Sequence, residues 1–279
     1  MNEQNIGLWF YKTFLHDFIE LPDSEKNNSK RLNIWVTQNS SNILNLKWND
    51  YSQIGKSVFD NLSYPENILR TIELTTIYPG LVCGIGYEHE IGFANEFKLG
   101  FSFDNTSGLP YIPGSSIKGT IRSAFKDIGY LKSIIKESEL AVKLNLIDWR
   151  KLEKHIFEGF DYDNKTQLNT YQTDVFFDAF ISSVKDNSYF ISDDYITSHR
   201  QKDGSYSPLL DPNPIRFLKV RSAVIFKFQF LLFDAISEGK VMFSGELKEY
   251  LFRQILLDIG IGAKTNVGYG QFEEPKVKE

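Results

Sequence analysis

The chain has a single cysteine, Cys83, so it cannot form an internal disulfide, and no histidine follows that cysteine at the short spacing of a structural zinc site. Its four histidines are far apart in the sequence, so we expect no metal and no cofactor. This cysteine usage is typical of a reducing compartment, and we expect a cytoplasmic location.

Long apolar runs are also lacking. No stretch approaches the roughly 18 apolar residues of a membrane span, and the first ten residues carry Glu3 but no Lys or Arg ahead of an apolar segment. We therefore expect neither membrane insertion nor secretion. An excess of positive charge is missing too, because the net charge is −5. This disfavours a protein that coats nucleic acid over its whole surface, so any nucleic-acid contact has to come from local patches.

Hydrophobic periodicity predicts a core of four strands and two helices. The predicted strands cover 68–77, 173–184, 217–232 and 267–272, and the helices begin near Ser116 and cover 247–259. Their order along the chain is strand, helix, strand, strand, helix, strand, which is the order of a split βαβ unit. We expect an α+β fold of the ferredoxin-like or RNA-recognition-motif-like kind, with an antiparallel sheet, two backing helices, and helical and loop insertions.

The remaining segments are expected outside this core. Residues 1–65, where Asn, Ser and Asp cluster between short aromatic stretches, predict an irregular or mixed extension packed on the core. The core domain is expected over 66–279, with insertions at about 129–172 and 185–214. The first insertion should hold two short helices, the second of them beginning at Asp148. The other insertion is polar and should project as a loop.

Cations gather on two predicted surfaces beside the core. Lys118 and Arg122 lie four residues apart on the helix that begins near Ser116, away from its apolar stripe. Lys219, Arg221 and Lys227 occupy the polar face of the 217–232 strand. Both sets are candidate phosphate contacts. The alternative for each is pairing with acidic side chains of the chain itself.

The glycine-rich run 260–270, Gly-Ile-Gly-Ala-Lys-Thr-Asn-Val-Gly-Tyr-Gly, is the most specific local signal. It is not a P-loop, because Asp258 and Ala263 stand where that motif requires glycine, and the run follows a helix instead of opening one. Two interpretations remain open. The glycines can bring backbone N–H groups and the Lys264 ammonium close to a phosphodiester chain, or they can simply shape a tight turn with Lys264 in solvent.

Two segments in this order resemble the signature segments of RAMP proteins of CRISPR systems. They are Gly108-Leu-Pro-Tyr-Ile-Pro-Gly-Ser-Ser-Ile-Lys-Gly-Thr-Ile-Arg122 and the glycine-rich run 260–270. Between them, residues 175–179, 194–199 and 211–218 are similar to the branch of that superfamily formed by the sixth subunit of the type III-B (Cmr) complex. The resemblance spans about residues 68–272 and adds little for the first sixty.

The resemblance implies a non-catalytic RNA-binding subunit of an antiviral type III-B CRISPR effector complex, one that caps the filament near the 3′ end of the CRISPR RNA. Implied partners are CRISPR RNA, target RNA, and the backbone, small and other capping subunits of the Cmr complex. The RNA contacts carried over are Gly114, Ser115, Lys118, Arg122, Gly262, Lys264, Thr265, Gly268 and Tyr269. His199 and Arg221 are further candidates, and for His199 a loop that touches a neighbouring subunit or only solvent is the alternative.

Two other functions are considered. The first is a stand-alone RAMP endoribonuclease that processes precursor CRISPR RNA, with Glu88, His89, Glu90 and Glu96 as acid–base candidates in the loop after the first strand. Backbone RAMP subunits place a cleaving aspartate in this region, whereas no Asp occurs here between Ile77 and Asp104, which favours the non-catalytic interpretation. The second is a scaffold that touches little RNA, in keeping with the negative net charge.

Overall fold

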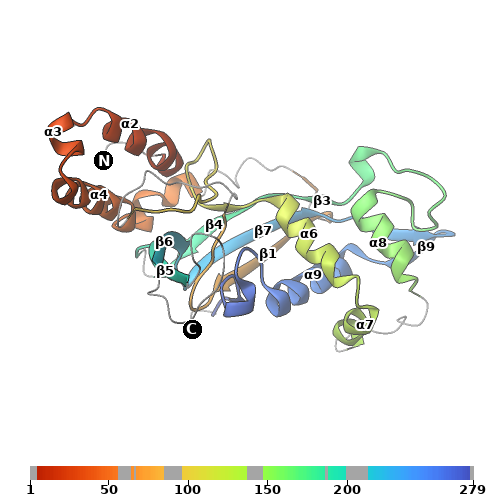
Figure 1. Ribbon diagram of the computed structural model, residues 1–279. Helices are drawn as coiled ribbons and strands as arrows, with labels where there is room; N and C mark the ends of the chain where they lie inside the picture. The colour runs from red at the N-terminus through yellow and green to blue at the C-terminus, as the bar shows by residue number, and fades with distance from the viewer. Residues whose placement is uncertain are drawn as a thin grey trace.

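A computed structural model describes most of the chain. The described residues are 5–55, 64–65, 67–84, 96–136, 147–185, 188–198 and 213–276. Figure 1 shows a central sheet, with the N-terminal helices gathered at one end of the molecule and α8 (Trp149–Glu158) and β9 (Lys240–Phe243) at the other.

Six strands of the described residues form the main sheet, and every pair in it is antiparallel. β1 (Leu69–Thr76) and β7 (Val224–Leu231) lie side by side in its centre. β10 (Phe272–Glu273) extends it beyond β1, while β4 (Ala179–Val184) and β2 (Tyr111–Ile112) extend it beyond β7, and β3 (Val175–Phe176) also pairs with β7. The order β10-β1-β7-β4-β2 confirms the predicted α+β class and the strand over 68–77.

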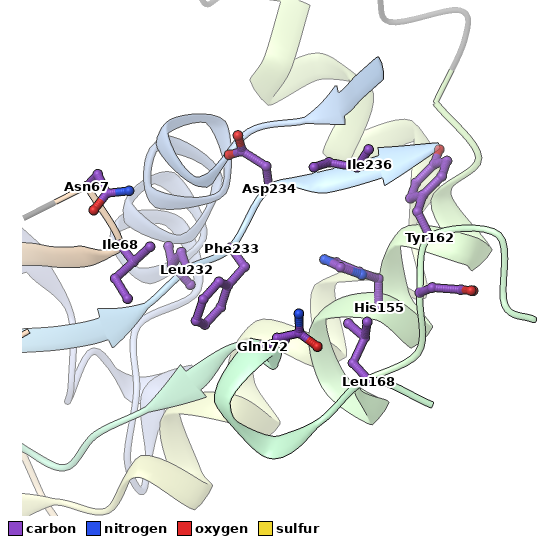
Figure 2. Close-up of a pocket in the computed structure, with 11 residues that line it drawn as sticks. Asn67, Ile68, His155, Tyr162, Leu168, Gln172, Leu232, Phe233, Asp234 and Ile236 are labelled. Carbon is purple, nitrogen blue, oxygen red and sulfur yellow. The ribbon is translucent and has the colours of Figure 1, made fainter. Parts of the chain in front are cut away.

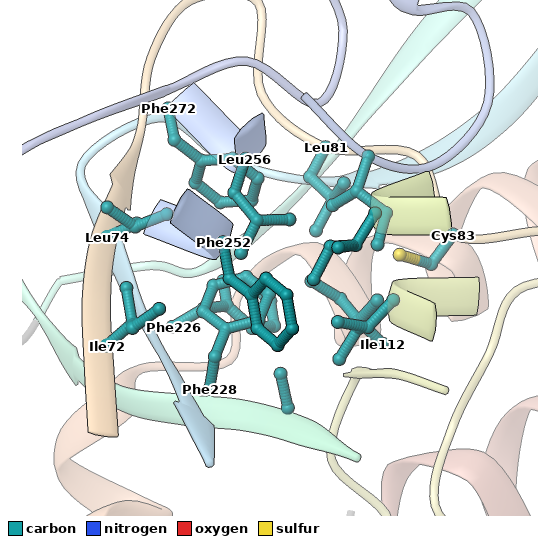
Figure 3. Packing of buried hydrophobic residues seen from close by; sticks show 14 of the residues in the cluster. Ile72, Leu74, Leu81, Cys83, Ile112, Phe226, Phe228, Phe252, Leu256 and Phe272 are labelled. Carbon is teal, nitrogen blue, oxygen red and sulfur yellow. The ribbon is translucent and has the colours of Figure 1, made fainter. Parts of the chain in front are cut away.

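Two helices, α6 (Gly114–Ala124) and α9 (Gly245–Ile259), cover one face of this sheet (Figure 1). On that face Ile72 is opposite Phe228 and Leu74 is opposite Phe226, and all four side chains are fully buried beside Phe252 of α9 (Figure 3). Complete burial of such a side chain contributes roughly 1.5–3 kcal/mol. The alternation of β1 and β7 therefore fixes which face carries the helices.

Capping chemistry sets the ends of the predicted helices. The Ser244 hydroxyl accepts the N–H of Leu247 at 3.2 Å, and Gly260, with φ of 71°, ends α9 as predicted. Asp148 caps α8 as predicted, and α7 (Ile128–Lys136) is the other helix of that insertion. α6 begins two residues before the predicted Ser116, directly after Pro113. None of the described helices is both long and apolar enough to cross a membrane.

The N-terminal segment is helical, which corrects the expectation of irregular or mixed structure. The polar residues that suggested loops act as caps: the Asn5 side chain accepts the N–H of Leu8 at 2.8 Å, and the Asn28 side chain caps α4. Apolar side chains such as Trp9 join the same buried core as the sheet. The elements are α1 (Ile6–Leu8), the π-helix η1 (Trp9–Thr13), α2 (Phe14–Ile19), α3 (Asp23–Lys26), α4 (Ser29–Leu44) and the 3-10 turn η2 (Trp48–Asp50).

The predicted strand over 217–232 is wrong as a single element. β6 (Asn213–Val220) is separated from β7 by a turn in which Ala223 has φ of 63°. The Thr76 hydroxyl donates to the Arg221 carbonyl at 2.7 Å and accepts the N–H of Val224 at 3.1 Å, which fixes this turn against the end of β1. β6 leaves the main sheet and pairs with β5 (Ile191–Ser198), so part of the predicted loop over 185–214 is a strand.

Shorter elements also differ from the predictions. The strand over 173–184 is divided into β3 and β4. The predicted final strand over 267–272 is mostly turn: its first residue ends the 3-10 turn η6 (Thr265–Val267), and only Phe272 belongs to a strand, β10. Outside the named strands, Phe103 forms an isolated antiparallel bridge with Pro110. The 3-10 turn η4 (Thr170–Gln172) and the hairpin of β8 (Ala235–Ser237) and β9 were not predicted. Such pieces contain too few residues for a period to show.

Candidate nucleic-acid interface

A cavity of about 570 Å³ lies between α6 and the glycine-rich segment 260–270. It joins the two segments that the sequence singled out, although they are far apart along the chain. Further lining comes from the stretch after β1 and from the residues before α6. The lining residues are Cys83, Gly84, Ser102, Ile112, Pro113, Ser116, Gly119, Thr120, Ser123, Ile261, Gly262 and Ala263. The fold therefore brings residues 108–122 and 260–270 together, but no Lys or Arg is among the residues that line the cavity between them.

Small and hydroxyl side chains form the α6 wall of this cavity. Ser116, Gly119, Thr120 and Ser123 recur at spacings of three and four residues and so share one helix face. The Ser123 hydroxyl donates to the Thr120 carbonyl at 2.7 Å, whereas the hydroxyls of Ser116 and Thr120 have no partner among the described residues. Hydroxyls both donate and accept, which suits phosphate and ribose oxygens. Sequence reasoning missed this face because it searched for charge, although the spacing was visible.

The glycine-rich segment is anchored to the chain that leaves β1. Gly270 donates its N–H to the Gly80 carbonyl at 2.8 Å, and Ala263 donates to the Val82 carbonyl at 2.9 Å. A Cβ at Gly262 would lie 2.6 Å from the Val82 carbonyl oxygen, and one at Gly270 would lie 1.8 Å from the carbonyl oxygen of Ile261. These glycines therefore permit close backbone packing inside the protein. A structural role for the run is established, and it leaves Gly262 exposed on the cavity wall.

Lys264 projects from the segment next to that wall. Its backbone has φ of 64°, it precedes η6, and its side chain is exposed. No described carboxylate lies within ion-pair distance of its ammonium group. Thr265 begins η6 and Gly268, with φ of 94°, ends it, so both shape the turn that presents Lys264.

The N-terminus of α6 already has an anionic partner. Gly114 donates its N–H to the Asp178 carboxylate at 2.6 Å, and a Cβ at Gly114 would lie 2.3 Å from the Phe176 carbonyl oxygen. The predicted donation from Gly114 to RNA would therefore require the Asp178 bond to break. Ser115 is exposed but is not among the residues that line the cavity.

The predicted basic edge of α6 faces away from the cavity. Arg122 contacts Glu153 at 2.9 Å and Glu158 at 2.5 Å, both on α8. Both hydrogen bonds raise the pKa of Arg122, and the bond to Glu153 has the larger effect. The Lys118 ammonium lies 5.8 Å from the centroid of the Phe176 ring. Arg122 is therefore paired with acidic side chains of the chain itself. Neither Lys118 nor Arg122 lines the cavity.

Tyr269 connects the glycine-rich segment to the β5–β6 hairpin. Its hydroxyl donates to Oδ2 of Asp194 at 2.7 Å, and the Lys219 ammonium contacts the same oxygen at 2.5 Å. Burial raises the pKa of Tyr269, as does the bond to Asp194. Burial opposes ionisation of Asp194 as well, but the hydrogen bonds from Lys219 and Tyr269 outweigh it and lower the pKa of this carboxyl. Lys219 is therefore an internal partner of Asp194.

The other cations of the 217–232 run do not share one face. Arg221 lies in the turn between β6 and β7 and is exposed. Lys227 lies in β7, directly opposite Glu73 of β1. The prediction of one basic strand face is therefore wrong, because the turn divides the run. His199 lies outside the described residues.

Of the four acid–base candidates for RNA cleavage, one lies among the described residues. Glu88, His89 and Glu90 lie outside the described residues, whereas Glu96 is described and is only 2% exposed. No group of three or more His, Cys, Asp or Glu side chains that could hold a metal ion occurs in the described part of the chain. The burial of Glu96 removes one of the four acid–base candidates from the surface.

Comparisons with known proteins point to one family. The model of the RAMP superfamily matches residues 73–273. CRISPR system CMR subunit Cmr6 of Saccharolobus solfataricus is 26% identical over 230 residues, which cover 80% of this chain and 65% of that relative. The match therefore spans less than two thirds of the relative's own length.

Solved structures give a likeness of fold. A chain in the cryo-EM structure of the type III-B Cmr-beta bound to cognate target RNA has a TM-score of 0.53 and 24% identity, covering 98% of this chain and 86% of that one. The crystal structure of Cmr6 from Pyrococcus furiosus covers 74% of this chain and 99% of that chain at 22% identity, but its TM-score of 0.35 supports no argument. Because the family model matches residues 73–273, which is more than half of the chain and includes both core helices, the chain belongs to the RAMP superfamily.

Proposed function

We propose that this chain is a Cmr6-like, non-catalytic RNA-binding subunit of a type III-B CRISPR effector complex that acts in antiviral defence. The observation that carries the proposal is the cavity between α6 and the glycine-rich segment. It offers unpartnered hydroxyls on one wall and glycine backbone on the other. Lys264 stands beside it, so one phosphate can meet a cation and several neutral donors together.

The fold supports this assignment. Four neighbouring strands of the sheet lie in the order β10-β1-β7-β4. Along the chain, α6 comes between β1 and β4, and α9 comes between β7 and β10. We assign this order to a ferredoxin-like core, in which the cavity lies where the first core helix meets the turn that leaves the second. The segments that build it are the two that resemble RAMP signatures.

The proposed partners follow from the relatives. One relative is named as a Cmr subunit, and a structural neighbour belongs to an assembly bound to target RNA. In the proposal, this chain holds CRISPR RNA near its 3′ end, caps the filament, and contacts target RNA and neighbouring Cmr subunits. The net charge of −5 favours local contact with RNA over coating of the whole surface.

Charge reversal at Lys264 tests the proposed site. Lys264→Glu should lower the RNA occupancy of the assembled complex, and the salt dependence of binding should lose about 0.7 in log–log slope if one phosphate contact to single-stranded RNA is removed. Lys132→Glu is the matched control, because Lys132 is exposed on α7 and does not line the cavity. Equal RNA occupancy in the two variants would reject the site.

The absence of catalysis needs its own measurement. The purified chain is incubated with CRISPR repeat RNA, and the proposal expects no cleavage. Specific cutting that is lost in His89→Ala would replace it with the endoribonuclease function.

A further inference from the structure

Tyr78 is the most exposed large apolar side chain of the described residues, with an exposed fraction of 84%. It lies in the turn that follows β1, and its hydroxyl has no hydrogen-bond partner in the described part of the chain. One exposed ring is ordinary on a protein surface. The groups around Tyr78 therefore decide what this ring can bind.

Arg221 adjoins the turn that carries Tyr78. The hydroxyl of Thr76, two residues before Tyr78, donates to the Arg221 carbonyl at 2.7 Å. Two residues after Tyr78, a Cβ at Gly80 would lie 3.3 Å from the Arg221 carbonyl carbon. The Arg221 side chain is exposed, and it forms no ion pair with a described carboxylate. An aromatic ring and an unpaired guanidinium thus project from adjacent backbone.

The glycine-rich segment packs against the same turn. A Cβ at Gly268 would lie 3.4 Å from Cδ of Pro79, the residue after Tyr78. Along this segment, Lys264 lies between the residues that line the cavity, 261–263, and Gly268. Val267, the last residue of η6, is 69% exposed and adds apolar surface. The surface around Tyr78 therefore continues from the cavity beside α6 by way of Lys264.

A second tyrosine extends this surface beyond Arg221. The Arg221 N–H donates to the Phe190 carbonyl at 3.0 Å, and Tyr189, the preceding residue, forms an isolated bridge with Lys47. The Lys47 ammonium lies 5.7 Å from the centroid of the Tyr189 ring. Cations and rings therefore alternate in a set that we call the tyrosine stripe: Lys264, Tyr78, Arg221, Tyr189 and Lys47.

The tyrosine stripe carries an excess of positive charge. Lys185, which follows β4, adds to it, because its N–H donates to the carbonyl of Ala223 in the turn after Arg221. The carboxylates of the adjoining strands have cationic partners: Asp193 has Arg216, Asp194 has Lys219, and Glu273 has Lys276. Asp50 of η2 is exposed and forms no ion pair among the described residues, so the cations of this surface outnumber it.

This pattern fits one chemical class of ligand. Unpaired bases stack on aromatic rings while Arg and Lys contact the phosphates between them, whereas a base inside a duplex is already stacked and paired. We propose that RNA leaves the cavity beside α6 as an unpaired strand, passes Lys264 and stacks a base on Tyr78, with Arg221 and Lys185 at the neighbouring phosphates. The inference rests on the proposed function and deepens it, because it names the form of RNA that this surface binds.

Base stacking can be measured separately from charge. The probe is a single-stranded RNA of about 12 nucleotides that contains 2-aminopurine, whose fluorescence falls when the base stacks, and it is bound to the full-length chain. Tyr78→Leu removes the aromatic ring and keeps an apolar side chain. Its dissociation constant for the probe should rise roughly five- to 150-fold, with loss of the quenching. Tyr78→Phe should retain both affinity and quenching.

Tyr171→Leu is the matched control. Tyr171 is 75% exposed and lies in η4, whose last residue lines a second cavity, of about 380 Å³ (Figure 2). No Lys or Arg is among the described residues that line that cavity. Its two carboxylates are bound within the chain, Asp234 by the Gly245 N–H at 2.8 Å and Asp161 by the Lys165 N–H at 2.7 Å. Tyr171→Leu should therefore bind the probe like the wild type.

The outcomes distinguish this inference from the proposed function. Equal dissociation constants for Tyr78→Leu and Tyr171→Leu, with weaker binding by Lys264→Glu, would overturn the inference and leave the proposed function standing. If Tyr78→Leu binds the probe like the wild type but joins the reconstituted complex less well, the ring contacts a protein subunit, and the inference is again overturned. A wild-type chain that binds neither the probe nor its duplex form would remove the proposed function itself.

Discussion

The Tyr269 hydroxyl donates a 2.7 Å hydrogen bond to the Asp194 carboxylate, and this bond joins the glycine-rich segment to β5. Because Lys219 of β6 contacts the same carboxylate oxygen, the hairpin and the segment share one polar junction. The Tyr269 ring also lies edge-on to Phe217, with centroids 6.0 Å apart. The junction sets where the turn that carries Lys264 sits, although none of its members lines the cavity.

Asp194 makes this junction sensitive to acid. The pKa of Asp194 in the fold is below its ordinary value of 3.8, so the junction stabilises the protein at pH values above 3.8, and this contribution is lost as the pH falls through the lower, folded value. Asp194→Asn should therefore show a smaller loss of stability between pH 5 and pH 2 than the wild type, about the window in which such a carboxyl titrates. Urea denaturation across that range measures it. Parallel acid dependence in both proteins would contradict the role assigned to Asp194.

Alanine substitutions at Gly270 and Gly239 allow the cost of a steric clash to be distinguished from the cost of backbone strain. Their φ values, 70° and 73°, are nearly equal, but a Cβ at Gly270 would lie 1.8 Å from the Ile261 carbonyl oxygen, whereas nothing lies within 4 Å of a Cβ at Gly239. Gly239→Ala should cost about 1 kcal/mol of unfolding free energy from strain alone. Gly270→Ala should cost at least about 2 kcal/mol more, because the backbone has to move. Similar values from urea denaturation would show that the segment adapts and that Gly270 is not required for packing.

The buried pair Lys248–Asp174 should be far more sensitive to loss of one partner than of both. Lys248→Met leaves the Asp174 charge buried without its cation and should cost about 3–5 kcal/mol. The double variant Lys248→Met with Asp174→Asn should recover part of this loss, since Asn can still accept the Phe233 N–H at that position. A double-mutant cycle by chemical denaturation measures the coupling. A double variant no more stable than Lys248→Met would show that the single loss is due to packing and not to an uncompensated charge.

Local patterns predicted the elements that are long and regular. The alternation of Ile72 and Leu74 was sufficient for β1, and Asp148 and Gly260 marked helix ends because caps act within one turn. The N-terminal helices were missed because Asn and Ser serve equally as loop residues and as caps. The turn at Ala223 interrupts a run whose apolar residues continue on both sides, so no change of period reveals it.

The candidate site shows a similar division. The two signature segments were identified and they do meet, but the side chains on their shared wall were not predicted. Arg122 was chosen for its charge, yet its partners Glu153 and Glu158 come from an insertion helix whose position no local pattern encodes. Ion pairs between residues far apart in the sequence thus decide which cations of a helix are free to bind a ligand. Local sequence patterns do not predict such pairs.

Thr120 provides a direct test of the hydroxyl wall. Thr120→Val removes the hydroxyl and keeps the shape of the side chain, so RNA affinity of the assembled complex should fall about two- to tenfold, as expected for one hydrogen bond worth roughly 0.5–1.5 kcal/mol. Thr37→Val is the matched control, because Thr37 lies on α4 and its hydroxyl donates to the Asn33 carbonyl of the same helix. That control should leave RNA affinity unchanged. If Thr120→Val also binds RNA like the wild type while Lys264→Glu does not, the phosphate lies outside the cavity on the Lys264 side, and the α6 wall is a packing surface without a ligand.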